Sequence, residues 1–310
     1  MKQNRKQFLQ LAGTATAAAM LPTLEGLAEK PTTLGKANDG YALKVFATNW
    51  GFEGSIDSFC AKAKRDGYDG IENWWPGTLP AQQDMFEAVK KHDLDLAIVY
   101  GAGEGTYAKH ALTFKANLDL IAKRPGYKPL YINLHSGKDH FKAEENAALI
   151  DYSIALAKET GIPIYHETHR GRMLFAAHTT AEFLKKHPGL KLTLDISHWC
   201  NVHESMLEDQ KQATDLALQH TEHIHARVGH QQGPQVADPR APEWAYALEA
   251  HLAWWDAVVA RKRKQGALIT FLAEFGPPHY MQTLPYTQQP LSNQWEINVF
   301  MKNLLKKRYG

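Results

Sequence analysis

Strand-like and helix-like segments alternate along most of this chain, and that alternation constrains its fold more than any other feature. From residue 41 onward, eight short apolar runs are each followed by a loop and a helical pattern. For example, the run LDLAIVYGAG precedes a predicted helix over 107–122, and PLYINLHSG precedes one over 143–160. Such alternation is typical of parallel strands joined by crossover helices. Eight repeats within about 250 residues favour a single closed (β/α)8 TIM barrel over an open, doubly wound sheet.

The expected helices are indicated by apolar residues that recur on one face. They cover 55–67, 82–92, 107–122, 143–160, 180–187, 206–219 and 244–263, and the tail over 285–310 supplies a last one. The first strand ends in Asn49-Trp50-Gly51 without a GxGxxG motif, so a dinucleotide-binding fold is not indicated. No domain boundary is visible after residue 40. We therefore expect residues 41–310 to form one barrel that ends in a C-terminal helix.

The first 28 residues resemble an export signal. A charged segment over 4–10 precedes the weakly apolar stretch LAGTATAAAMLP, and small residues that follow could form a cleavage site. The pattern is similar to a twin-arginine signal, although Lys6 stands in place of the second arginine. Residues 11–22 are too short and too polar to span a bilayer. We therefore expect an exported, periplasmic protein in which 29–40 is a polar linker. A disordered cytoplasmic tail is the alternative.

Charge and cysteine content argue against several classes of protein. The chain has 35 basic and 33 acidic residues, so its formal net charge is only +2 with the histidines neutral. A dedicated nucleic-acid or membrane-surface binder would carry a basic stripe, which this balance does not suggest. The two cysteines, Cys60 and Cys200, lie inside predicted elements. This placement excludes a disulfide framework and predicts two buried free thiols.

Four residues of types that commonly bind metal ions end four consecutive apolar runs in the second half of the chain. They are Glu167 in IPIYHETH, Asp195 in LKLTLDISH, His225 in EHIHARVG and Glu274 in ALITFLAEFG. Because the C-terminal ends of the strands form the active face of a barrel, we expect these side chains to converge. Three carboxylates and an imidazole without a counter-charge would repel one another, so a divalent cation is the natural occupant.

The types of ligand and the positions of the two glutamates suggest a chemistry. Carboxylate oxygens with one imidazole suit Mn²⁺, Mg²⁺, Co²⁺ or Zn²⁺, and the sequence does not distinguish these ions. Such a cation can hold two adjacent sugar oxygens and polarise a carbonyl, which eases removal of the neighbouring proton. Glu167 and Glu274 are expected to approach a sugar from opposite sides, so that one removes a proton and the other returns it.

Tryptophan and histidine residues are numerous near the predicted strand ends. Trp50, Trp74, His135 and His169 are candidate substrate-binding residues, since aromatic faces and imidazoles suit the apolar faces and hydroxyl edges of a sugar. Trp74 and its neighbour Trp75 could equally be packing residues, and the sequence leaves both interpretations open.

Together these residues give the chain a resemblance to the xylose isomerase-like TIM barrel superfamily, over about residues 41–285. That superfamily includes sugar phosphate isomerases and epimerases, ketose 3-epimerases, inosose dehydratase and endonuclease IV. In ketose epimerases the metal is held by Glu, Asp, His and Glu on strands five to eight, which matches the four strand-end residues here. His225 is preferred to His223 as the matching histidine because it lies nearer the end of its strand. The resemblance also implies substrate contacts for His198, in the Asp-x-x-His pattern that begins at Asp195. His135 matches a common fourth-strand histidine.

The sequence departs from the epimerases after the seventh strand. Arg227 lies two residues after His225, whereas the corresponding arginine of the epimerases lies several residues further on. The loop over 230–243 differs as well, so the resemblance does not identify the substrate. Arg227 and Arg240 could bind an acidic or keto group, or they could only pair with carboxylates.

The leading hypothesis is a metal-dependent isomerase or epimerase that works through an enediolate on a non-phosphorylated sugar. A close rival is a lyase or hydratase that uses the same site on a 3-keto sugar or keto-glycoside. Export favours a free or glycosidic sugar in either case, because phosphorylated sugars are scarce outside the cytoplasm. We expect a small-molecule partner, no nucleic acid and no membrane span, and the sequence leaves the oligomeric state open.

Two other classes of function receive less support. An endonuclease IV-like phosphodiesterase would need an Asp-x-His on the seventh loop, and the comparable stretch reads Asp238-Pro239-Arg240. A non-catalytic sugar-binding barrel would not need an acid–base pair beside a metal.

Overall fold

The computed structural model describes residues 26–27, 29, 31 and 34–310. The predicted export signal over 1–28 therefore lies almost wholly outside the described residues, and the predicted linker over 29–40 lies partly outside them. In the part of the chain that is described, no helix combines the length and the apolar character needed to cross a bilayer.

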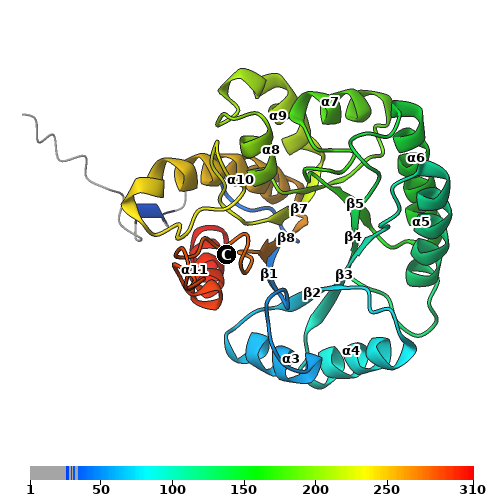
Figure 1. The fold of residues 1–310 in the computed structure, drawn as a ribbon, viewed down its shortest axis with the longest axis horizontal. Coiled ribbons are helices and arrows are strands. Elements are labelled where there is room, and N and C mark those ends of the chain that lie inside the picture. The colour runs from blue at the N-terminus through cyan, green and yellow to red at the C-terminus, as the bar shows by residue number, and fades with distance from the viewer. Residues whose placement is uncertain (1–25, 28, 30, 32–33) are drawn as a thin grey trace, which may run out of the picture.

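Eight parallel strands close into a barrel at the centre of the molecule (Figure 1). The strands are β1 (Ala42–Thr48), β2 (Gly70–Trp74), β3 (Asp95–Gly101), β4 (Ile132–His135), β5 (Ile164–Glu167), β6 (Leu192–Leu194), β7 (Thr221–His225) and β8 (Leu268–Ala273). Each strand pairs in parallel with the next along the chain, and β8 closes the ring by pairing with β1. The predicted (β/α)8 barrel is therefore confirmed.

Helices surround the barrel on its outside and lie close to their predicted positions (Figure 1). They are α3 (Ile56–Arg65), α4 (Leu79–Lys91), α5 (Tyr107–Ala122), α6 (Ala143–Thr160), α7 (Ala177–Lys186), α8 (Ser197–Val202), α9 (Lys211–His220), α10 (Ala245–Gln265) and α11 (Gln294–Tyr309). The bounds of α5 and α6 are those predicted. Gly161 ends α6 at φ 69°, a left-handed conformation that glycine adopts without strain.

The helix predicted over 206–219 begins later than expected. After β6 the chain first forms α8 and a 3-10 turn at Glu208–Gln210, and α9 starts only at Lys211. The Asp195 carboxylate accepts hydrogen bonds from the backbone N–H of Ser197 at 3.1 Å and from the Ser197 hydroxyl. These bonds satisfy a free donor at the start of α8 and stabilise a helical turn that the apolar pattern does not reveal.

The tail of the chain closes the gap outside β1 and β8. Asn293 caps α11 by accepting hydrogen bonds from the backbone N–H groups of its first turn. The helix packs against β1 and β8, with Ile297 and Leu304 buried. Near its end the Tyr309 ring stacks on Phe271 of β8 at 5.5 Å between ring centroids. The helix expected in the tail thus covers the seam at which the barrel closes.

The apolar core occupies two places. Most buried apolar side chains fill the layer between the strands and the helices, where Phe59 and Trp255 are fully enclosed. A separate cluster lies inside the barrel and consists of Phe46, Ala97, Tyr131 and Leu272. The thiols of Cys60 and Cys200 are buried and unpaired, as predicted. Above the inner cluster the barrel interior is polar, and there the candidate site is found.

Candidate metal centre

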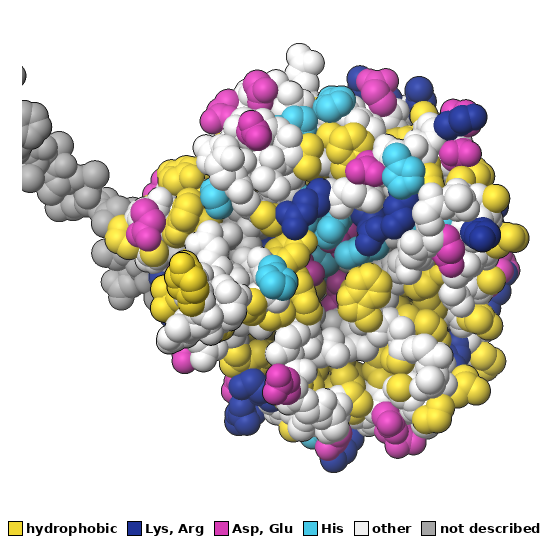
Figure 2. Space-filling model, viewed as in Figure 1, with side chains coloured by type: hydrophobic (Ala, Val, Ile, Leu, Met, Phe, Trp, Pro, Cys, Tyr) yellow, Lys and Arg dark blue, Asp and Glu magenta, His cyan; other side chains and the backbone are white. Residues whose placement is uncertain are grey.

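Four side chains converge at the C-terminal end of the barrel. Glu167 ends β5 and His225 ends β7, while Asp195 and Glu274 directly follow β6 and β8. Ligand atoms from all four lie within 4.8 Å of one another. Figure 2 shows acidic and histidine side chains at the bottom of a hollow in the centre of this face. The structure thus brings together the four residues that the sequence singles out as metal ligands.

Three buried atoms of this cluster have no hydrogen-bond partner among the described residues: Glu167 Oε1, His225 Nδ1 and Glu274 Oε2. His225 Nδ1 lies 2.8 Å from Glu274 Oε2 and 3.6 Å from Glu167 Oε2. The shorter contact is an ion pair only when the imidazole is protonated. Because buried polar atoms without partners are uncommon, their convergence fits a shared divalent cation. Oxygen ligands with one nitrogen suit Mn²⁺, Mg²⁺, Co²⁺ or Zn²⁺.

The charges around the cluster also favour a cation. Three of the four side chains are carboxylates, and the neighbouring guanidinium of Arg227 contacts Asp195 and lies 3.7 Å from Glu274. Burial raises the pKa of Asp195 to about 6, and Glu274 and Glu167 add to this rise although Arg227 opposes it. Burial alone would lower the pKa of His225, but the surrounding carboxylates raise it well above its usual range. Positive charge is therefore favoured at this point, and either a protonated imidazole or a bound cation supplies it.

Two residues of β4 hold the Glu167 side chain in place. Its Oε2 atom accepts a hydrogen bond from Asn133 at 2.8 Å and lies 2.8 Å from His135 Nε2. Burial would raise the pKa of Glu167, but His135 and His225 lower it well below its usual range. Glu167 is thus kept as a carboxylate whose Oε2 is occupied by neighbours and whose Oε1 remains available.

A cavity of about 220 Å³ opens beside the cluster, and Glu274 forms part of its wall. Five of the six predicted substrate-binding residues also line this cavity: Trp50, Trp74, His135, His169 and Arg227. The sixth, His198, is fully buried behind His169, with the two ring centroids 3.8 Å apart. Its Nε2 accepts a hydrogen bond from Arg227 at 2.8 Å. His198 therefore supports the wall of the cavity from behind.

The two neighbouring tryptophans of β2 and the following loop have different surroundings. Trp74 is 46% exposed, and its ring meets that of His135 edge-on at 5.0 Å between centroids. Trp75 is partly buried and packs against Phe86 of α4. Trp74 thus lines the cavity beside the cluster, whereas Trp75 packs against α4 and does not line that cavity.

Two further alternatives left by the sequence are also decided. His223 Nδ1 lies 3.0 Å from the Thr270 carbonyl oxygen, deeper in the barrel, so His225 is the histidine of the cluster. Arg240 pairs with Asp238 at 2.6 Å and does not line the cavity. Of the two arginines considered for substrate binding, the structure places one, Arg227, at the cavity.

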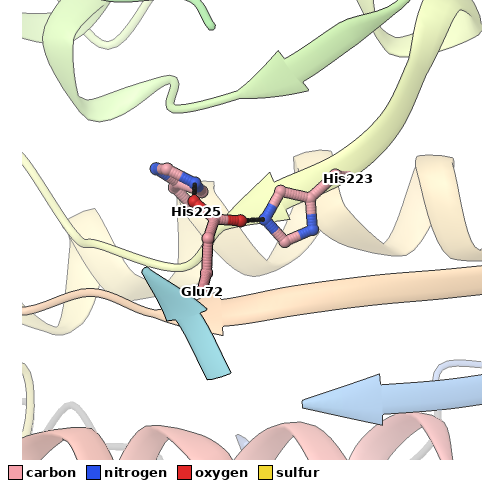
Figure 3. A group of neighbouring side chains, drawn as sticks. All are labelled: Glu72, His223 and His225. Atoms are coloured by element: carbon pink, nitrogen blue, oxygen red, sulfur yellow. Dashed lines mark hydrogen bonds and ion pairs between the residues drawn. The ribbon is translucent and has the colours of Figure 1, made fainter. Parts of the chain in front are cut away.

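Sequence reasoning missed four polar residues of the site. They are Glu72, Tyr131, Asn133 and Tyr280. Glu72 is 1% exposed and lies between the rings of His225 and His223 (Figure 3). Burial would raise the pKa of Glu72, but these two imidazoles lower it. One signal for Glu72 was available, because it stands two residues before Trp74 and so faces the same side of β2. Tyr280 comes from the loop after β8, where no periodic pattern identifies it.

No protein-family model and no curated protein matches this chain. Solved structures do share its fold. A xylose isomerase-like TIM barrel protein from Mycobacterium smegmatis, in complex with magnesium, has 11% identity and a TM-score of 0.57, over 85% of this chain and 96% of that one. A xylose isomerase domain containing protein from Salmonella typhimurium has 13% identity and a TM-score of 0.54, over 88% and 98%.

A third similar structure is a probable 3-DHS dehydratase involved in petrobactin synthesis from Bacillus anthracis. It has 15% identity and a TM-score of 0.53, over 85% of this chain and 98% of that one. At such low identity the likeness is one of fold. The chain therefore has the xylose isomerase-like (β/α)8 fold that its sequence resembles.

Proposed function

We propose that this protein is a divalent-cation-dependent sugar isomerase or epimerase that acts on a non-phosphorylated sugar. The observation that carries the proposal is the four-residue cluster at the mouth of the barrel, in which three buried ligand atoms lack other partners. A cation held there would polarise a carbonyl of the substrate and lower the cost of removing the neighbouring proton. A magnesium complex of a protein with the same fold agrees with this proposal.

Glu274 and Glu167 are the acid–base pair in this proposal. Glu274 lines the cavity with 14% of its side chain exposed, so it can exchange a proton with a substrate there. Glu167 is almost fully buried, but its partner His135 lines the same cavity. The two carboxylates come from different strands, β5 and β8. In this proposal one of them removes a proton and the other returns it.

The walls of the cavity support a small sugar without a phosphate. Trp50 and Trp74 offer aromatic surface to the apolar face of a sugar, and His169 offers a hydrogen-bonding edge. Arg227 already pairs with Asp195, which neutralises charge that a phosphate would otherwise meet. A volume of about 220 Å³ lies below the range of pockets for drug-sized ligands. The export proposed for this chain agrees, because phosphorylated sugars are scarce outside the cytoplasm.

Hydrogen exchange in D₂O tests the proposal. Metal-loaded protein would be incubated with free sugars and 3-keto sugars, and the products would be followed by NMR. We expect deuterium at the carbon beside the carbonyl while the sugar remains intact. Chelation of the metal should abolish the exchange. The Glu274→Gln variant should show no exchange even when no chelator is added. An absence of exchange with every sugar, although the cation is bound, would refute the proposal.

A lyase or hydratase with the same centre is the second candidate, and one observation favours it. A larger cavity of about 790 Å³ adjoins the first and shares Trp74 with it. A glycoside bound at the centre could extend its leaving group across Trp74 into this space. One protein of the same fold is described as a probable dehydratase. Release of an aglycone or of water in the D₂O experiment would favour this candidate over isomerisation.

A further inference from the structure

Glu72 is a buried carboxylate that neither proposed reaction uses. It lies on β2, across the barrel from β7, and its two oxygens point to the two histidines of that strand (Figure 3). Glu72 Oε1 lies 3.0 Å from His225 Nε2, and Glu72 Oε2 lies 3.1 Å from His223 Nε2. Because a buried carboxylate is costly without such partners, its position opposite a metal-ligand histidine calls for a role.

Glu72, His223 and His225 are close enough together to hold a cation of their own. Their hydrogen bonds argue against it. Tyr131 donates its hydroxyl hydrogen to Glu72 Oε2 at 2.6 Å, and both histidines lie within hydrogen-bond distance of the carboxylate. Neither Glu72 oxygen is among the buried atoms that lack a partner, in contrast to the atoms of the cluster above. The atoms that these three residues turn toward one another thus form a satisfied hydrogen-bond network, and such a network orients its members.

The orientation of His225 matters because its two ring nitrogens have different tasks. A neutral imidazole carries one hydrogen and one lone pair, and the partner of one nitrogen decides which atom remains free to bind a metal. Nδ1 faces Glu274 and Glu167, whereas Nε2 faces Glu72. A carboxylate accepts hydrogen bonds and donates none, so Glu72 favours the ring that carries its hydrogen on Nε2.

The contacts of Asn133 argue against the alternative ring, in which the hydrogen of His225 is on Nδ1. Its Nδ2 atom also lies near His225 Nε2, at 3.2 Å, and could donate to a bare Nε2. However, that amide has two hydrogens, and it donates to Glu167 at 2.8 Å and to Glu72 at 3.3 Å. Its second hydrogen thus has two acceptors at nearly equal distances, and the charged Glu72 carboxylate is a stronger acceptor than a neutral imidazole nitrogen. The hydrogen between His225 and Glu72 is therefore assigned to the histidine.

We propose that Glu72 is a positioning residue that holds His225 with its hydrogen on Nε2, so that Nδ1 is the atom that binds the cation. This inference rests on the cation centre of the proposed function and adds to it a residue from β2, a strand that carries none of the four ligands. Partners of this kind, which hold the second nitrogen of a metal-bound histidine, typically change metal affinity by about 10-fold to 100-fold. Tyr131 and His223 in turn anchor Glu72, so the carboxylate does not turn away.

Cobalt titration of two variants tests the role of Glu72. Glu72→Gln keeps the size of the side chain but replaces the acceptor with an amide that can donate to Nε2 and leave the hydrogen on Nδ1. Glu222→Gln is the matched control, since Glu222 lies on the same strand as His225 but pairs with Lys262 and Arg261 outside the barrel. Calorimetry and the visible spectrum of Co²⁺ should show binding about 10-fold to 100-fold weaker in Glu72→Gln and unchanged in Glu222→Gln.

A second measurement needs no variant and covers the case in which Glu72→Gln does not fold. In the zinc-loaded wild-type protein, ¹⁵N NMR of the histidine side chains should show Nδ1 of His225 bound to metal and a hydrogen on Nε2. Metal on Nε2 would overturn the inference. So would wild-type cobalt affinity in a folded Glu72→Gln protein, and the proposed function would survive either result. If the wild-type protein binds no divalent cation, the proposed function and this inference fail together.

Discussion

His251 on α10 should make the protein sensitive to mild acid. The ring is fully buried, its Nδ1 lies 2.8 Å from the Ala247 carbonyl oxygen, and its Nε2 accepts a hydrogen bond from the Gly229 backbone N–H at 3.2 Å. Both contacts suit a neutral ring with its hydrogen on Nδ1. A second hydrogen on Nε2 would point at the hydrogen of the Gly229 N–H, so protonation of the ring is unfavourable in the folded protein. Burial accordingly lowers the pKa of His251 from 6.5 to about 4.

The sign and size of the effect follow from these two pKa values. Because the pKa of His251 is lower in the folded protein than in the unfolded chain, the unfolded chain binds more protons between pH 6.5 and 4. The stabilisation is therefore complete above pH 6.5 and is lost as the pH falls towards 4. Between pH 7.5 and pH 5 this residue alone should lower the free energy of unfolding by about 2 kcal/mol.

Urea unfolding of wild type and His251→Gln at pH 7.5 and pH 5 measures this contribution. Glutamine can still accept from the Gly229 N–H but does not titrate. We expect the wild type to lose about 2 kcal/mol more than the variant on acidification, whatever the stability of the variant at pH 7.5. His140→Gln, at an exposed histidine, should lose as much as the wild type. Equal losses in wild type and His251→Gln, or an NMR titration that gives His251 a pKa near 6.5, would refute the reasoning.

Three further predictions concern the site. A divalent cation at about 100 times its dissociation constant should raise the free energy of unfolding by about 2.7 kcal/mol, and calorimetry that shows the same melting temperature with and without chelator would contradict this. Asp195→Asn should destabilise the protein by about 3–5 kcal/mol in urea unfolding, because it removes the carboxylate that contacts the buried Arg227 and leaves only the more distant Glu274. A change below about 1 kcal/mol would speak against that pair. Trp74→Ala should raise KM while kcat and stability change little, because Trp74 is half-exposed at the cavity wall; an unchanged KM would remove it from the binding site.

The residues of the cluster could be predicted because a local pattern places each of them. Glu167, Asp195, His225 and Glu274 each stand at the end of an apolar run, and parallel strands of a barrel bring such ends to one face. The choice of His225 over His223 follows from the same reasoning, since it lies nearer the end of its strand. The tryptophan pair on β2 and the following loop could not be resolved in this way, because both residues stand at the end of the same run.

The limits of prediction are clearest at α8 and Tyr280. The early helical turn after β6 depends on hydrogen bonds that the Asp195 carboxylate makes to Ser197, and apolar spacing carries no trace of them. Tyr280 reaches the cavity from a loop, where its ring lies 4.7 Å from the Arg227 guanidinium. Loop conformations depend on packing against distant residues, so no short pattern in the sequence indicates that contact.

By itself, the sequence determined the order of strands and helices and the residue that ends each strand, because hydrophobic periodicity is a property of neighbouring residues. Only the tertiary structure decided that Glu72 meets His225, a contact between residues 153 positions apart. That contact exists because β8 pairs with β1 and closes the sheet, which places β2 only three strands from β7 around a narrow interior. How deep each side chain lies there, and which nitrogen of a histidine faces which carboxylate, depends on packing across the whole barrel.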